Sequence, residues 1–189
     1  MTQRELSFEE LANGLKASDH GAYKVLFDRM YEPLLRYVYR FTQDESLCLD
    51  VVQDVFMKLW EKRQKLIVHT SLKALLYTMC RNQALNAIRG KDRTVGMSEI
   101  TQTEPINPGA GIEHDISTRQ LDAFFKAWVK ELPPRRAEAF VLSRYHGFSH
   151  AEISDIMGLS KRTIDTHIVH ALRFLRSRFD FLQKQGAGS

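Results

Sequence analysis

Cysteine is scarce in this chain of 189 residues, which contains only Cys48 and Cys80. Both lie in apolar, helix-patterned stretches, so we interpret them as buried, reduced thiols rather than as the disulfide framework of a secreted domain. The first ten residues, MTQRELSFEE, lack the apolar segment of a signal peptide. No apolar run approaches the roughly 20 residues that are needed to span a bilayer. We therefore expect a cytoplasmic protein.

Sequence motifs of catalysis are missing as well. The chain has no glycine-rich phosphate loop, no paired-cysteine zinc signature and no recognisable nucleophile motif. His167 and His170 lie one helical turn apart, but no third metal ligand accompanies them, so we expect neither a metal nor a cofactor. These absences favour a protein that is not an enzyme. An enzyme with a scattered active site, or a helical interaction module, is the alternative.

The composition is that of a folded and mildly basic protein. The formal net charge is +4, and 43% of the residues are hydrophobic. This apolar content is enough to build a core, so the chain is not of the disordered class. The positive balance fits a nucleic-acid partner without requiring one.

Apolar residues recur at steps of three and four along most of the chain, which predicts helices. The pattern covers three long segments in the first half, at residues 21–41, 45–63 and 71–89. Ser7 and Glu10 form a capping-box signature for a shorter helix before them. Pro33 interrupts the first long segment and predicts a kink or a local break there. Four helices of this kind can enclose one core.

The composition changes between residues 94 and 118. This segment contains five glycine and proline residues and four carboxylates, but no lysine or arginine. About 25 residues without periodicity are too many for an ordinary loop and indicate a flexible acidic linker. We therefore predict an all-α protein of two small domains. The predicted boundaries are a helical domain at 1–93, the linker at 94–118, a second helical domain at 119–183 and a flexible tail at 184–189.

The second domain contains the sequence pattern of a helix-turn-helix. Ser149 with Glu152 begins a short helix, Gly158 ends it as a left-handed cap, and Ser160 begins a longer helix. Such a motif inserts the start of its second helix into the major groove of DNA. An ordinary helical hairpin with a solvated basic face is the alternative. The candidate DNA-binding residues are Ser160, Lys161, Arg162, Thr163, Asp165, Thr166, His167, Arg173 and Arg176.

Three motifs in this order resemble the bacterial sigma factors of the extracytoplasmic-function (ECF) type in the sigma-70 family. Residues 49–60, LDVVQDVFMKLW, resemble the helix that binds core RNA polymerase. Residues 76–93 resemble the promoter-melting segment that follows it. The stretch LPPRR at 132–136, together with the helix-turn-helix, resembles the second conserved domain. The resemblance covers residues 22–179 and implies a transcription initiation factor that catalyses no reaction.

The resemblance assigns a role to each motif. Core-polymerase binding falls on Asp50, Gln53, Asp54, Phe56 and Trp60, of which the two carboxylates and the amide share one helix face. Recognition and melting of the −10 element fall on Leu72, Arg81, Asn82, Asn86, Arg89, Lys91 and Arg93. The helix-turn-helix is expected to bind the −35 element. The implied partners are core RNA polymerase, through its β′ clamp and β subunits, promoter DNA and a membrane-anchored anti-sigma factor.

One motif departs from the commonest family pattern. Many members carry basic residues where this chain has Asp165 and His167. The sequence TIDTHI at 163–168 instead resembles a subgroup that is frequent in Bacteroidetes, so a different promoter half-site is expected. A helix-turn-helix regulator that is not a polymerase subunit is the alternative function. The polymerase-binding motif at 50–60 argues against it.

Overall fold

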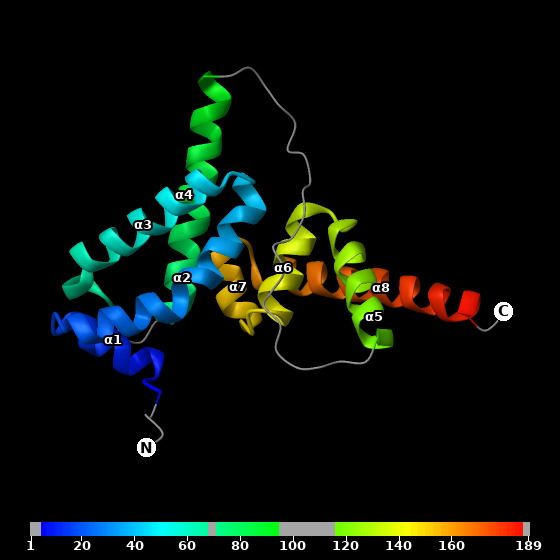
Figure 1. Ribbon diagram of the computed structural model, residues 1–189, viewed down its shortest axis with the longest axis horizontal. Coiled ribbons are helices and arrows are strands. Elements are labelled where there is room, and N and C mark those ends of the chain that lie inside the picture. Colours follow the sequence, from blue (N-terminus) through cyan, green and yellow to red (C-terminus); the bar gives the residue numbers. More distant parts are fainter. Residues whose placement is uncertain (1–4, 68–70, 95–115, 187–189) are drawn as a thin grey trace. The chain divides into compact units, whose positions relative to one another are not determined.

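The computed structural model describes residues 5–67, 71–94 and 116–186, and every α-helix in these ranges is labelled in Figure 1. No strand occurs in the described ranges, so the prediction of an all-α fold is confirmed. Contacts divide the chain into two compact units, residues 1–106 and 107–189. Most of the expected linker lies outside the described residues. Among the described helices, none has the length and apolar character to cross a membrane.

The described part of the first unit consists of four α-helices and one short 3-10 helix. Their bounds are α1 Phe8–Lys16, α2 His20–Thr42, α3 Glu45–Glu61, η1 Arg63–Lys65 and α4 Leu72–Thr94. The expected capping box begins α1, because Ser7 Oγ accepts from the Glu10 amide at 3.1 Å and Glu10 Oε2 accepts from the Ser7 amide at 2.7 Å. Local hydrogen bonding therefore sets this helix start as the sequence predicted.

Helix α2 runs unbroken through Pro33, so the local break, one of the two alternatives that the sequence predicted, does not occur. A proline inside a helix removes one hydrogen bond, at a cost of about 3 kcal/mol. Met30, Leu34 and Tyr37 flank it on the same helix and are all buried. Packing of these side chains in the core offsets the lost bond and keeps the helix continuous.

The core of the first unit lies where α1, α2, α3 and α4 meet. Tyr37 of α2 and Tyr77 of α4 are both buried, with ring centroids 4.8 Å apart. Cys48 and Cys80 are free and buried, as expected. Burial raises the pKa of the Cys80 thiol to about 12, so this thiol stays neutral. Both cysteines therefore act as small core residues.

The second unit is a smaller helical assembly. Its elements are α5 Ile116–Lys130, α6 Pro134–Arg144, α7 His150–Met157 and α8 Lys161–Gly186. Trp128, Phe140 and Leu175 bring α5, α6 and α8 together in one core cluster. Helix α8 continues to Gly186, whereas the sequence analysis expected a flexible tail from residue 184. The helix is longer because no proline or glycine interrupts it before Gly186.

Candidate functional site

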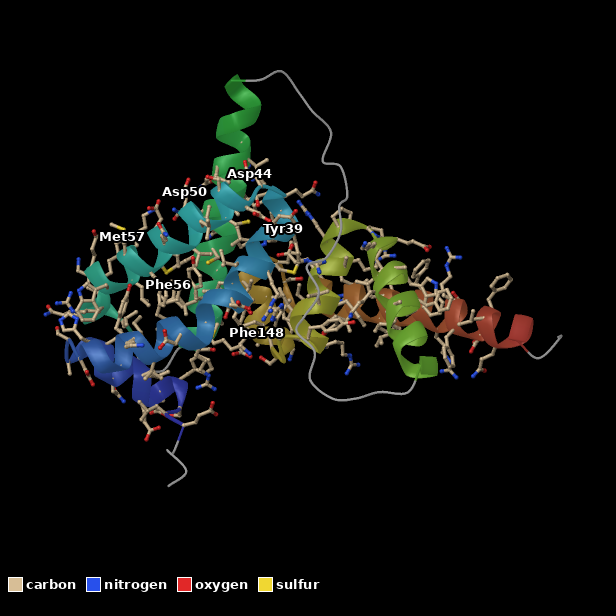
Figure 2. All side chains as sticks on the ribbon, viewed as in Figure 1. Tyr39, Asp44, Asp50, Phe56, Met57 and Phe148 are labelled. Atoms are coloured by element: carbon tan, nitrogen blue, oxygen red, sulfur yellow. The ribbon has the colours of Figure 1, made fainter. Side chains whose placement is uncertain are left out.

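The exposed face of α3 carries the residues expected to bind polymerase. Asp50, Gln53 and Asp54 are exposed on this helix. Figure 2 shows Asp50 and Met57 on the outer side of α3 and Phe56 on the side toward α2. The Met57 side chain is 60% exposed, although the sequence analysis did not select it. Met57 is an apolar residue that does not follow the three- and four-residue spacing of the buried positions of α3. This mismatch could have identified it as an exposed apolar residue.

Two aromatic residues of the same motif pack against α2, Phe56 as a buried residue and Trp60 as a half-buried one. Phe56 is 1% exposed, and its ring centroid lies 4.8 Å from that of Phe27. Trp60 lies 5.0 Å from the Tyr23 ring, centroid to centroid, and the Arg63 guanidinium covers it at 4.3 Å. The assignment of Phe56 as a polymerase contact is therefore corrected, because a buried ring cannot touch a partner. Phe56 and Trp60 fix α3 on the helix beneath it.

A small hydrogen-bond network joins the α3 face to α4. Gln83 of α4 donates from Nε2 to Asp54 Oδ2 at 2.7 Å, and Gln83 Oε1 accepts from Lys58 Nζ at 2.9 Å. Lys58 Nζ also lies 3.9 Å from Asp54 Oδ2. One of the two candidate carboxylates on this face is therefore already held in place, whereas Asp50 has no such tether among the described residues.

Helix α4 carries an exposed polar stripe, which consists of Asn82, Asn86 and Arg89. These residues follow one another at steps of four and three, so they share a helix face, and all three are exposed. This end of α4 extends beyond the other helices of the first unit (Figure 1). The stripe is therefore open to a large partner.

The remaining residues assigned to melting behave differently. Leu72 is 3% exposed and lies in the core, so its assignment as a DNA contact is corrected. Arg81 is half-buried. Lys91 and Arg93 belong to the last turn of α4, but their side chains lie outside the described set. Of the predicted set, the described residues that are exposed rather than buried or half-buried are the three of the α4 stripe.

The helix-turn-helix has the predicted local geometry. Ser149 and Glu152 form the capping box of α7, and Gly158 ends that helix with φ of 63°, in the left-handed region that favours glycine. Ser154 Oγ donates to the Leu159 carbonyl at 2.6 Å and closes the turn. Ser160 Oγ then accepts from the Thr163 amide at 3.1 Å at the start of α8. Ser160 and Thr163 are therefore occupied in forming the helix start.

A basic stripe runs along the exposed side of α8. It consists of Arg162, Thr166, Val169, Arg173 and Arg176, which are all exposed and follow at steps of four and three. The three arginines form no ion pair within the described part of the chain. Val169 was missed by the sequence analysis, although its position out of phase with the buried Ile164 and Ile168 was a usable signal.

Two further groups lie beside this stripe. Asp165 Oδ1 is 2.5 Å from His150 Nδ1 at the start of α7. His167 is half-buried, and its pKa is lowered first by desolvation and then by the positive charges of Arg136, Arg135 and His170. The Nε nitrogen of Arg136 is buried and has no hydrogen-bond partner in the described structure. Cations from α6 and α8 thus gather on one side of the second unit.

In the described residues, no group of three or more histidine, cysteine, aspartate or glutamate side chains is arranged to hold a metal ion. The two surfaces instead carry exposed carboxylates and amides in the first unit and exposed cations in the second. Exposed cations on a capped helix are suited to phosphate and base edges. Exposed carboxylates are suited to a basic protein surface.

Two family models match the chain, in order. The model of sigma-70 region 2 matches residues 26–94, and the model of sigma-70 region 4 matches residues 127–175. RNA polymerase sigma factor SigZ of Bacillus subtilis is 27% identical over 135 residues, which cover 71% of this chain and 74% of SigZ. ECF RNA polymerase sigma factor SigL of Mycobacterium tuberculosis is 25% identical over 175 residues, which cover 87% of this chain and 92% of SigL.

Solved structures share the fold. The sigma factor RpoE of Bartonella quintana, in complex with the anti-sigma factor NepR, gives a TM-score of 0.64 at 24% identity and covers 84% of this chain and 96% of RpoE. CnrH, in complex with the cytosolic domain of CnrY, gives 0.62 at 20% identity and covers 92% of this chain and 97% of CnrH. With both regions present in order, the chain belongs to the sigma-70 family of RNA polymerase sigma factors and, within it, to the ECF type.

Proposed function

We propose that this chain directs core RNA polymerase to specific promoters and starts transcription there without catalysing a reaction itself. The observation that carries the proposal is the order of the two matched regions, the second of which contains a helix-turn-helix with an exposed basic stripe. A regulator that only binds DNA needs no region 2. Because this chain has one, DNA binding by the second unit is coupled to polymerase binding by the first.

Each surface has a proposed partner. The exposed α3 face, with Asp50, Asp54 and Met57, suits a basic surface with an apolar spot, and we assign it to the β′ clamp. The α4 stripe would hold unpaired bases of the −10 element, because amide side chains both donate and accept toward base edges. The proposed division of the chain is 1–93 for these tasks, 94–118 for a linker that extends to the β subunit, and 119–183 for the −35 element.

The second unit is proposed to bind the −35 duplex with the start of α8 in the major groove. A helix rises about 1.5 Å per residue, so Arg173 lies roughly 16 Å beyond Arg162 along the axis. The major groove is only about 12 Å wide, which places Arg173 and Arg176 near the backbone phosphates. Val169 lies between Arg162 and Arg173 on α8 and would suit the methyl group of a thymine. The residues at 163–168 support membership of the subgroup frequent in Bacteroidetes.

An anti-sigma factor is the proposed regulator. RpoE of Bartonella quintana was solved with the anti-sigma factor NepR, and CnrH with the cytosolic domain of CnrY. A regulator that binds through a distinct cytosolic domain is compatible with an anchor in the membrane, and we propose such a membrane-anchored anti-sigma factor for this chain. Its binding would compete with polymerase for the same exposed surfaces.

Reconstitution with core RNA polymerase tests the proposal. The mixture should transcribe from a subset of a random promoter library, and core polymerase alone should not. Asp50→Lys should weaken association with core polymerase about ten-fold or more, because charge reversal at a matched interface is repulsive. Asp28→Lys is the matched control, since Asp28 is also exposed on a helix of the first unit but lies outside the α3 face. Binding of DNA without any association with polymerase would contradict the proposal and favour a conventional regulator.

A further inference from the structure

Asp165 is an unusual residue for a helix that binds DNA. From Lys161 to Arg178 it is the single acidic residue among five lysine and arginine residues. A carboxylate at the groove is repelled by the phosphates unless it accepts a hydrogen bond from a base. Its conformation therefore decides whether it opposes DNA binding or contributes to base recognition.

The structure gives Asp165 a partner on the other helix of the motif. His150 is the first residue of α7, and its Nδ1 lies 2.5 Å from Asp165 Oδ1. An ionised carboxylate can only accept, so the imidazole donates from Nδ1. Lys161 lies one turn before Asp165, yet it forms no ion pair within the described part of the chain. Asp165 is therefore bonded across the motif rather than along its own helix.

The exposure of this pair makes a purely stabilising role a poor explanation. The His150 and Asp165 side chains are 39% and 48% exposed. Ion pairs with this much solvent contact contribute little to folding stability, because water screens them and ordering two side chains costs entropy. What the contact does achieve is to fix one oxygen of the carboxylate and hence the direction of the other.

We propose that His150 is a positioning residue for base recognition by Asp165. With Oδ1 held by His150, the Oδ2 oxygen is directed outward and accepts from an exposed amino group in the major groove, which cytosine N4 or adenine N6 supplies. The inference rests on the proposed function, because it requires the second unit to bind promoter duplex. Without His150, Asp165 is free to turn toward Lys161 or Arg162 on its own helix, and base discrimination is lost.

Selection of binding sites by the complete polymerase complex tests the proposal. The full chain and its variants are assembled with core polymerase and allowed to select from promoters with a randomised −35 region. Asp165→Ala should flatten the preference at one base pair, by about ten-fold. His150→Ala should flatten the same position, and the double variant should select as Asp165→Ala does.

Two amide variants separate positioning from simple packing. His150→Asn retains a nitrogen donor at the same number of bonds from Cα as Nδ1, whereas His150→Gln moves the same amide one bond further out. We expect His150→Asn to show the wild-type preference at this base pair. We expect His150→Gln to show the same loss of preference as His150→Ala. Thermal unfolding of each variant identifies any that is misfolded, and Gln provides the test if Ala fails to fold.

Other outcomes would overturn the inference in distinguishable ways. If His150→Ala keeps the base-pair preference but has a lower melting temperature, His150 only stabilises the fold. If His150→Ala weakens binding to all promoter sequences equally and the base-pair preference is retained, His150 contacts phosphate only. An unchanged preference in Asp165→Ala would exclude base recognition by this carboxylate. If the wild-type complex selects no promoter at all, the proposed function itself fails, and this inference with it.

Discussion

Gln83 on α4 and Asp54 on α3 are joined by a hydrogen bond of 2.7 Å, from the Gln83 amide to the carboxylate. The contact spans 29 positions of the sequence and links the α3 face to the helix that bears the α4 stripe. Lys58 donates to the same amide at 2.9 Å. Hydrogen bonds therefore tie the surface proposed for polymerase binding to the helix that carries the surface proposed for promoter melting.

The first prediction concerns this network. Asp54→Ala and Gln83→Ala should be coupled in a double-mutant cycle of unfolding free energy, by about 0.5 to 1 kcal/mol, because each removes the same partly exposed hydrogen bond. Chemical denaturation of the four proteins gives the cycle. Asp28 is a matched control, since it pairs with Lys24 of its own helix. The network assignment fails if Gln83→Ala couples as strongly to Asp28→Ala as to Asp54→Ala.

The second prediction concerns melting. Asn82→Ala combined with Arg89→Ala removes two members of the exposed α4 stripe and should leave polymerase binding intact. Open-complex formation on duplex promoters should fall about ten-fold or more, since contacts to unpaired bases and phosphates are lost. A promoter with a pre-melted bubble should restore part of the rate, because strand separation is then already complete. An equal loss on both templates would place the stripe outside the melting step.

Much of the fold could be predicted because its signals are local. Ser7 with Glu10, and Ser149 with Glu152, each form a capping box within one turn. Gly158 adopts the left-handed conformation expected from the sequence. Hydrogen bonds over three or four residues need no knowledge of the rest of the fold. The existence of the helices and of the helix-turn-helix therefore followed from the sequence.

The roles of individual side chains were harder to predict, because they depend on packing. Phe56 and Leu72 were both predicted to contact a partner, yet both are buried, since a helix mixes core and surface positions. Met57 was overlooked although it is exposed. The partner of Asp165 lies on another helix, and nothing within one turn of that residue indicates His150. Contacts between distant segments come from the tertiary structure alone.

The third prediction separates phosphate contacts from base contacts on α8. Arg173→Ala and Arg176→Ala should weaken binding to all promoter sequences alike and leave the sequence preference unchanged. Each lost phosphate contact should also lower the salt slope of log affinity by about 1. Titration of the complete polymerase complex with promoter DNA at several salt concentrations measures both effects. A changed preference at a single base pair would instead indicate base contact by these arginines.

The fourth prediction concerns the stability of the second unit against acid. Burial and the charges of Arg136 and Arg135 lower the pKa of His167 in the folded chain, whereas the unfolded chain has the ordinary value near 6.5. Below about pH 6.5 the unfolded state therefore binds more protons, and stability falls as the pH falls toward the lowered folded pKa. Above about pH 6.5 both states carry a neutral imidazole, and this contribution to stability is fully present.

His167→Gln removes this titration, so the variant should lose less stability than the wild-type chain between about pH 7.5 and pH 5.5. Urea denaturation, followed by Trp128 fluorescence in a Trp60→Phe background, reports on the second unit alone, because Trp128 lies in its core. Carboxylate titrations affect both proteins alike and cancel in the comparison. Arg136→Gln supplies an independent check, since removing a nearby cation should raise the His167 pKa in an NMR titration. Equal acid losses in the wild-type and His167→Gln proteins would show that this imidazole does not govern the acid sensitivity.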